Sequence, residues 1–154
     1  MEQLENIPQD IDPVQISARI HAPINRIWNA LTQPALMRQW YFDIDREQLQ
    51  DGDTFQFYEP GDENKFLHEC LILEMNEPEK FRHTWTYPLL SKGSSTVNWD
   101  LEAHDDETEV IITHEGIHHL YDGGDGIAKE NFINGWKEIL NVSLRNFVES
   151  TDVK

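Results

Sequence analysis

The first clear pattern in the chain is an alternation of apolar and polar residues that begins at Val14. Val14, Ile16, Ala18 and Ile20 are apolar, whereas the residues between them are polar. Successive side chains of a β-strand point to opposite faces, so this period of two predicts a strand with one buried face. The preceding residues, 1–13, show no clear period and are expected to form an N-terminal tail.

After this strand the apolar spacing changes to that of a helix. Ile24, Ile27, Trp28 and Leu31 recur at intervals of three and four residues, which places them on one helical face. A second short helical segment is expected around residues 35–40. The pattern therefore predicts two short helices directly after the first strand.

Residues 47–116 form a succession of short alternating segments that are divided by turn signals. Short connections join antiparallel strands, so this region predicts an antiparallel sheet of about six to seven strands, the first strand included. Clusters of Gly, Pro, Asn and Asp mark the turns at residues 51–53, 60–62, 76–78, 92–93 and 105–107.

The chain closes with a long apolar stripe at helical spacing. The stripe covers residues 125–150, and a helix of about 25 residues extends over about 38 Å. A helix with so long an apolar face needs a broad, curved partner surface. The order of elements predicts an α+β fold in which a curved sheet wraps around a long C-terminal helix. The stripe consists of Phe132, Ile133, Trp136, Ile139, Leu140, Ser143, Leu144, Phe147 and Val148.

Several short motifs resemble those of a known family. Residues 20–23 (Ile-His-Ala-Pro) and 27–32 (Ile-Trp-Asn-Ala-Leu-Thr), with Pro34 and Trp40, resemble the opening of the homologues of the heat-shock protein 90 ATPase activator, which belong to the START-like superfamily. This resemblance implies one domain over residues 14–150 with a helix-grip fold. It also implies an elongated cavity between the sheet and the C-terminal helix, commonly used for lipophilic small molecules. Further matching elements follow in the family's order: Gly52 with Phe55, Glu77-Pro78 before Phe81, Thr84-Trp85, Thr108, His114, Gly116 and Gly135-Trp136.

Two positions depart from the family's pattern. Asp53 stands where the family often has a second glycine, and Cys70 stands where a strand glycine is expected. Cys70 is therefore expected to narrow the cavity or to redirect the strand. Because no basic residue adjoins it in the sequence, Cys70 is expected to be a buried apolar residue rather than a nucleophile. The resemblance implies no shared catalytic residue, and no cofactor is expected.

The composition says little about the fold, but its charge balance restricts the classes of partner. The chain has 154 residues, with 12 Lys and Arg against 29 Asp and Glu, which gives a formal net charge of −17 at pH 7. Nucleic acids and anionic membranes attract basic surfaces, so neither is an expected partner. The single cysteine cannot form an internal disulfide, and no apolar run approaches the length of a membrane span. A cytoplasmic location is expected.

Residues 114–118 read His-Glu-Gly-Ile-His, which matches the zinc motif H-E-x-x-H. In zinc peptidases this motif lies on a helix, where its two histidines are neighbours. Here the β-branched residues 110–113 predict a strand that ends at Gly116, and a strand would separate the two imidazoles by about 13 Å. No metal site is expected from the motif, although the pair His118–His119 is a candidate for adventitious metal binding.

The candidate ligand-binding residues are aromatic, imidazole and small side chains expected near the cavity, since such sites are mostly apolar with few polar groups. Among the strand histidines His68, His83 and His114, the last two keep the phase of apolar neighbours and are the better candidates for a polar anchor. A histidine satisfied within the core is the alternative for each, and core packing is the alternative for the aromatic residues. The predicted set is Trp40, Tyr41, Phe55, Phe57, Cys70, His83, Trp85, Trp99, His114 and Trp136.

Three functions remain open from the sequence. The leading hypothesis is a non-enzymatic module that binds a hydrophobic or aromatic small molecule in the cavity. The second is a chaperone-associated regulator with a role in the stress response, as the family name suggests. The third is suggested by cyclases and dehydratases of the same superfamily and requires His83 or His114 to act with a nearby carboxylate in acid–base chemistry.

Overall fold

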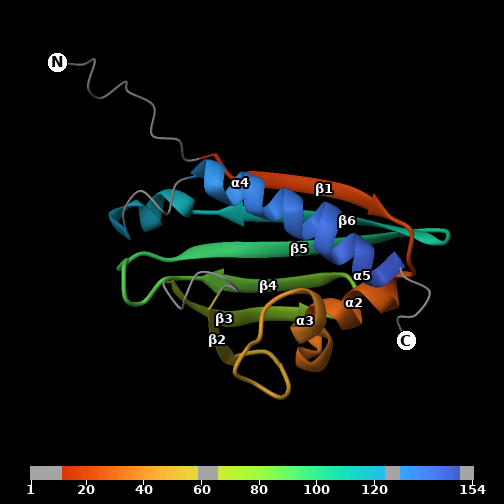
Figure 1. Cartoon of the computed structure of the whole chain (residues 1–154), viewed down its shortest axis with the longest axis horizontal. Coiled ribbons are helices and arrows are strands. Elements are labelled where there is room, and N and C mark those ends of the chain that lie inside the picture. The colour runs from red at the N-terminus through yellow and green to blue at the C-terminus, as the bar shows by residue number, and fades with distance from the viewer. Residues whose placement is uncertain (1–11, 59–65, 124–128, 150–154) are drawn as a thin grey trace, which may run out of the picture.

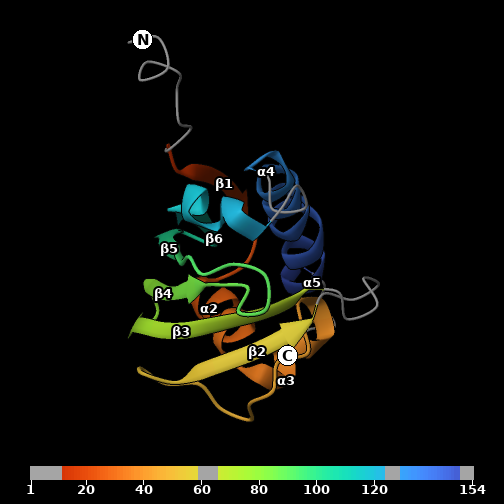
Figure 2. The same cartoon turned by 90° about the vertical axis from the view of Figure 1, so that its left-hand side faces the viewer.

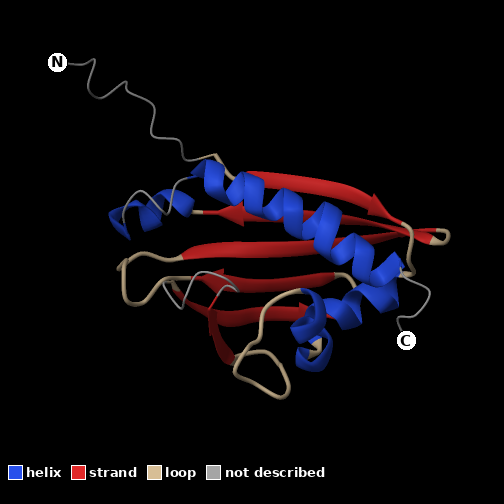
Figure 3. Cartoon of the chain, viewed as in Figure 1, coloured by secondary structure: helices blue, strands red, loops and turns tan. Residues whose placement is uncertain are grey.

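The protein is built on one antiparallel sheet of six strands in the order β1-β6-β5-β4-β3-β2 (Figures 1 and 3). Its structure is a computed structural model that describes residues 12–58, 66–123 and 129–149. The predicted α+β class and antiparallel sheet are confirmed, whereas the predicted tail, 1–13, lies almost wholly outside the described residues. The strands are β1 (Val14–Ile20), β2 (Thr54–Tyr58), β3 (Leu67–Asn76), β4 (Lys80–Trp85), β5 (Ser95–His104) and β6 (Glu107–Glu115).

Strands β2 to β6 form a meander in which each strand pairs with the next one in the chain. β1 is the exception, because it pairs with the last strand, and Ile16 lies opposite Ile112. The ladder between β3 and β4 shifts register between Ile72 and Glu74. A bulge of this kind bends a strand, which contributes to the curvature of the sheet.

One face of the sheet is apolar and buried because its residues follow the predicted alternation. Along β4, Phe81, His83 and Trp85 are buried, whereas the residues between them are half-buried. Trp28 packs against Phe81 edge to face, with ring centroids 6.3 Å apart, and is only 4% exposed. Trp28 therefore lies in the core, as its position on the apolar face of the predicted helix indicates.

The two predicted short helices follow β1. They are α2 (Ile24–Thr32) and α3 (Pro34–Trp40), divided at Gln33 because Pro34 begins a new helix. The indole Nε1 of Trp40 donates a hydrogen bond of 2.9 Å to the carbonyl oxygen of Ala30, which ties the end of α3 to α2.

The C-terminal helix lies to one side of the strands (Figure 2) and crosses the sheet (Figure 1). It comprises α4 (Lys129–Glu138), a π-helical segment (Ile139–Leu144) and α5 (Arg145–Glu149). The predicted ends of this helix, at residues 125 and 150, lie outside the described residues. No helix in the described ranges is long and apolar enough to cross a membrane.

The π-helical segment keeps the buried stripe of this helix on the sheet. Buried residues recur every four positions, which exceeds the 3.6 or so residues of an α-helical turn. A regular α-helix would therefore rotate the stripe gradually away from the sheet, and the wider turns of the π-helical segment counteract this rotation. The residues of the stripe are Phe132, Trp136, Leu140, Leu144 and Val148.

The H-E-x-x-H segment does not lie on one helix. β6 ends at Glu115, Gly116 has a φ of +78° that favours glycine, and a 3₁₀ helix (Ile117–Gly123) follows. His114 therefore belongs to the strand and His118 to the helix after the turn. The prediction that a strand end interrupts this motif is confirmed.

Candidate ligand-binding site

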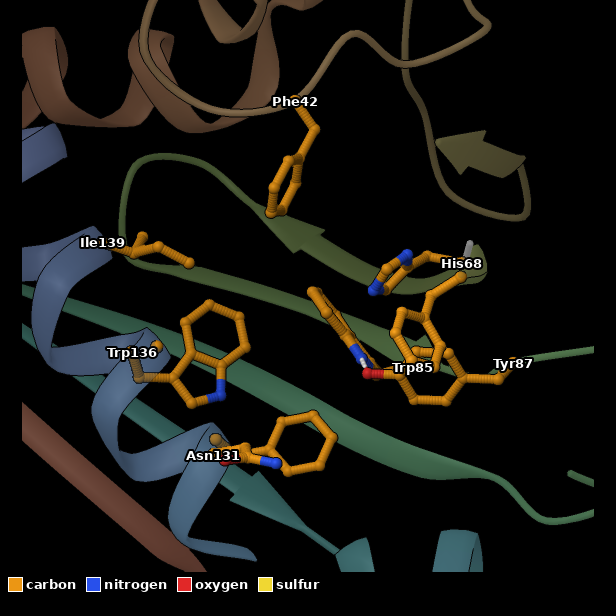
Figure 4. A pocket seen from close by; sticks show the side chains of 10 residues that line it. Phe42, His68, Trp85, Tyr87, Asn131, Trp136 and Ile139 are labelled. Carbon is orange, nitrogen blue, oxygen red and sulfur yellow. Dashed lines mark hydrogen bonds between the residues drawn. The ribbon is translucent and has the colours of Figure 1, made fainter. Parts of the chain in front are cut away.

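A cavity of about 280 Å³ lies between the buried face of the sheet and the C-terminal helix. Figure 4 shows the side chains around this space, with Trp136 and Ile139 on the helix side and Trp85, His68 and Tyr87 across from them. Most of the lining is aromatic. The lining residues are Phe42, Phe66, His68, Trp85, Tyr87, Asn131, Phe132, Gly135, Trp136 and Ile139.

Local structure explains why these side chains meet. Phe132 and Trp136 are four residues apart on α4, so they lie on the same helical face. Trp85 ends the alternating buried row of β4, and His68 belongs to the buried row of β3. Phe42 comes from the loop after α3 and closes the side between the helices and the sheet.

The walls of the cavity consist of rings that support one another. His68 stacks on Phe57 with ring centroids 4.6 Å apart and an interplanar angle of 11°. Phe57 in turn stacks on Phe42 at 4.2 Å. The rings of Trp85 and Trp136 meet at 5.2 Å with an angle of 64°. Such offset and edge-to-face contacts fix ring orientations, so the cavity has firm walls.

A buried hydrogen-bond chain stands behind this wall and joins α4 to β4, β5 and β6. The indole Nε1 of Trp136 donates to Nδ1 of His114 at 3.0 Å, so this nitrogen carries no hydrogen. Nε2 of His114 therefore carries the hydrogen and donates it to Oγ of Ser95 at 2.7 Å. The Ser95 hydroxyl donates to the carbonyl oxygen of Trp85 at 2.8 Å. Every group in this chain has its partner.

The buried imidazoles of His83 and His114 are held in the neutral form. Burial, followed by the proximity of His83, lowers the pKa of His114 to about 3. Burial lowers the pKa of His83 to about 4, although its hydrogen bond to the carbonyl oxygen of Thr84 opposes this shift. Within the described residues, the hydrogen bonds of these imidazoles lead to Ser95, Trp136 and Thr84 and none leads to a carboxylate.

The structure brings the predicted site residues together in three places. Trp85 and Trp136 line the cavity. Trp40 and Tyr41 line an adjoining groove of about 350 Å³, which shares Phe42, Gly135 and Ile139 with the cavity. The other six are buried beside or behind the cavity wall and do not line it; they are Phe55, Phe57, Cys70, His83, Trp99 and His114.

Cys70 packs within the sheet rather than narrowing the cavity. It lies opposite Phe55 in the β2–β3 ladder and is fully buried. Burial, with a smaller contribution from Glu69, raises the pKa of its thiol well above the ordinary value. A thiol in this state is a poor nucleophile, in keeping with the expectation of a buried apolar residue.

Eight lining residues are absent from the predicted set. Phe132 and Ile139 belong to the apolar stripe of the C-terminal helix, and His68 follows the buried phase of its strand, so the periodicity could have identified these three. Tyr87 continues the alternation of Phe81, His83 and Trp85, so it too could have been identified. Phe42 and Phe66 lie in loops, Asn131 is exposed and Gly135 has no side chain, so these four carry no periodic signal that points to a cavity.

Potential metal ligands gather away from this cavity. Among the described residues, one group of three is close enough to share an ion, namely Glu102, His104 and Glu109 on the β5–β6 hairpin. No third ligand joins His118 and His119 in this part of the chain. The histidines of the H-E-x-x-H segment are therefore not assembled into a metal site by the described residues.

Solved structures share this fold at low sequence identity. The alignment with CV1439 from Chromobacterium violaceum has a TM-score of 0.75 and 20% identity, and covers 90% of this chain and 98% of that one. For the Aha1 dimer from Colwellia psychrerythraea the TM-score is 0.70, with 17% identity and coverages of 91% and 98%. The alignment with DynU16, from the dynemicin biosynthetic locus, has a TM-score of 0.74 and 18% identity, and covers 93% of this chain and 48% of that one. The chain therefore spans about half the length of DynU16.

A family model identifies the group to which the sequence belongs. No curated protein matches the chain significantly. In contrast, the model described as Activator of Hsp90 ATPase homolog 1-like protein matches residues 21–149, which is most of the chain. The chain is therefore a member of the Activator of Hsp90 ATPase homolog 1-like family, the family that its sequence motifs resemble.

Proposed function

We propose that the protein is a small-molecule binding module that holds a hydrophobic or aromatic ligand between the sheet and the C-terminal helix. The observation that carries this proposal is the cavity of about 280 Å³ with its predominantly aromatic lining. Ligand sites in proteins are concave and mostly apolar, with a few polar groups that fix orientation. Tyr87, His68 and Asn131 supply polar groups of this kind.

The family and the fold support a ligand-binding or Aha1-like module. One structural relative, DynU16, comes from a biosynthetic locus, which is in keeping with a small-molecule ligand. An acid–base enzyme receives less support, because the two imidazoles that such chemistry would use lie behind the cavity wall and are neutral.

The test is a ligand screen on the full chain by thermal shift and ligand-observed NMR, with fatty acids, sterol-like compounds and flavonoid-like compounds. Ile139→Trp would fill the cavity from the helix, whereas Val142→Trp adds the same side chain at a position that is 49% exposed on the same helix. Ligands should raise the melting temperature of the wild type and of the Val142→Trp protein but not that of the Ile139→Trp protein. The proposal fails if no compound binds or if the Ile139→Trp protein binds as the wild type does.

A second candidate is a regulator of the chaperone Hsp90. It is favoured by the family match and by the likeness to the Aha1 dimer of Colwellia psychrerythraea. Leu71 and Leu73 on β3 are 39% and 43% exposed and offer an apolar contact surface on the sheet. In this case the protein should stimulate the ATPase activity of Hsp90, and Leu71→Asp with Leu73→Asp should abolish the stimulation without weakening ligand binding. No stimulation by the wild type would exclude this function.

A further inference from the structure

The lining of the cavity restricts the chemical class of the ligand, and the inference drawn from it rests on the proposed function. All lining residues that the structure describes, except Asn131, Gly135 and Ile139, carry a ring, and none of those described is Asp, Glu, Lys or Arg. We propose that the cavity selects an uncharged, planar aromatic molecule of two or three fused rings. The polar substituent of this ligand lies toward Asn131, and the absence of a side chain at Gly135 leaves room for the ligand.

The preference for a planar aromatic ligand follows from the arrangement of the rings. Trp85 and Trp136 meet at 64°, so the cavity presents both a ring face and a ring edge. Aromatic pairs gain energy beyond the area they bury when faces meet edges or offset faces. A puckered, saturated molecule of the same size fills the volume without this gain.

Net charge on the ligand is disfavoured for either sign. An anion would find no Lys or Arg among the described lining residues and would approach a protein with a formal net charge of −17. A cation would be attracted by the net charge and by the ring faces, but among the described lining residues it would find no carboxylate to repay the loss of its hydration. The carboxylate of Glu138 belongs to the adjoining groove. His114, whose ring lies 5.0 Å from Phe132 and 5.8 Å from Trp136, is itself kept uncharged by burial behind this wall.

The volume sets the size of the ligand. A cavity of about 280 Å³ is at the lower end of the range of about 300–1,000 Å³ found for small-molecule sites. At the packing density of a protein interior, about 0.74, it accommodates roughly 200 Å³ of ligand atoms. Two or three fused rings suit this space, whereas a sterol is too large for it.

Burial of the lining gives the ligand a direction. His68 and Tyr87 are buried, whereas Asn131 is exposed and therefore lies at the mouth of the cavity. The amide of asparagine both donates and accepts hydrogen bonds, so it suits a hydroxyl or carbonyl substituent. The rings of the ligand then lie inside and its polar group faces solvent.

Gly135 is an independent sign that this space is kept open. It lies within α4, where glycine destabilises a helix relative to alanine. A Cβ atom at this position would meet no heavy atom of the described residues within 4 Å, so packing against that part of the protein does not require glycine. Gly135 also borders both the cavity and the adjoining groove. A side chain here would occupy ligand space.

Calorimetric titration of the full chain with five probes tests the ligand class. The probes are 2-naphthol, its saturated analogue decahydro-2-naphthol, the anion 2-naphthoate, the cation 2-naphthyltrimethylammonium and the fatty acid laurate. We expect 2-naphthol to bind at least about tenfold more tightly than each of the others. Over decahydro-2-naphthol and laurate the preference comes from one to two aromatic contacts, and over the two naphthyl ions it comes from the cost of burying an unpaired charge. If 2-naphthol binds less than about tenfold more tightly than any one of the other four probes, this inference about the ligand class is overturned, whereas the proposed binding function stands. If none of the five probes binds, and no compound of the wider screen binds either, the proposed function fails as well.

Substitution of Gly135 tests the open space. Gly135→Leu should weaken 2-naphthol binding by about tenfold or more while the melting temperature stays at or above that of the wild type. Asn134→Leu adds the same side chain at an exposed position of the same helix and should leave binding unchanged. If the leucine variant does not fold, Gly135→Ala should still show a raised melting temperature with weaker binding. Wild-type affinity in the folded Gly135 variants overturns the role of Gly135.

Discussion

At the scale of single residues, His114 shows how a buried imidazole serves as a fixed connector. Its Nδ1 accepts from the indole of Trp136 and its Nε2 donates to Ser95, so both ring nitrogens are committed. Protonation would turn Nδ1 into a second donor that faces the indole donor. Burial and hydrogen-bond geometry therefore favour the same neutral form, and the orientation of Trp136 at the cavity depends on it.

The neutral state of His83 and His114 predicts a loss of stability in mild acid. Both imidazoles take up protons near pH 6.5 in the unfolded chain but only near pH 4 and pH 3 in the folded protein. The unfolded state thus binds more protons in this window, and the free energy of unfolding falls as the pH decreases below about 6.5. Each group contributes about 2 kcal/mol to the fall between pH 8 and pH 5.

Urea unfolding across this pH range, followed by intrinsic fluorescence, measures the effect. The His83→Asn protein lacks one of the two groups, so its stability should fall by about 2 kcal/mol less than that of the wild type over the same range. Equal falls in the two proteins would contradict the assignment of the pH dependence to His83.

Ser95→Ala should destabilise the protein by about 1–3 kcal/mol, because it leaves the buried Nε2–H of His114 without its acceptor. Ser94→Ala is the matched control, since the Ser94 side chain is exposed. Chemical unfolding gives the difference in free energy, and a weaker near-ultraviolet circular dichroism, to which Trp136 contributes with the other four tryptophans, reports loosened aromatic packing. Similar stabilities for the two variants would show that the hydroxyl of Ser95 contributes little.

At the scale of elements, the loop between β4 and β5 is fastened to the 3₁₀ helix. The carboxylate of Asp122 accepts hydrogen bonds from the hydroxyl of Ser91 and, at 3.0 Å, from the backbone N–H of Lys92. These donors lower the pKa of Asp122. Nδ1 of His119 lies 3.2 Å from the carbonyl oxygen of Ser94, which gives a second contact between the loop and the 3₁₀ helix. Because Tyr87 starts this loop, the fastening also supports one side of the cavity.

Gly93 makes a specific prediction about this contact. A Cβ atom at position 93 would collide with the backbone carbonyl of His119, which cannot move as a side-chain end can. Gly93→Ala should therefore cost about 2 kcal/mol and increase hydrogen exchange in the 3₁₀ helix. Leu89→Ala, at a position that is 74% exposed in the same loop, should change neither quantity. A Gly93→Ala protein as stable as the wild type would show that the loop shifts at little cost.

The elements differ in how far the sequence predicts them. Alternation along β1 and β4 and the apolar stripe of the C-terminal helix follow directly from side-chain geometry, and all three are confirmed. The cavity lining depends on which side chains meet in space. Phe42 and Phe66 come from loops without a period, and Gly135 contributes through the absence of a side chain. Periodicity also places Trp99 and His114 on the inner face of the sheet, but it does not distinguish residues that line the cavity from buried residues that lie behind the lining.

At the scale of the whole molecule, the formal net charge of −17 over 154 residues predicts salt-dependent stability. Like charges repel one another in the compact state, and salt screens them, with a Debye length of about 30 Å at 0.01 M and about 8 Å at 0.15 M. The melting temperature should therefore rise between these two sodium chloride concentrations. Asp105→Asn with Asp106→Asn, in the exposed β5–β6 turn, lowers the charge and should reduce the rise. A rise of the same size in both proteins would point to another cause.

The pairing of β1 with β6 has a consequence for synthesis on the ribosome. Ile20 and Thr108 are register partners, and 88 residues separate them along the chain (108 − 20). Strands β2 to β6 can pair with their neighbours as they emerge, whereas β1 is made first and must wait for the last strand. At about 5–20 residues per second this delay is roughly 4–18 s. During that time the apolar face of β1 has no sheet to cover it. We therefore expect β1 to be the strand at which the nascent chain most readily associates with other chains.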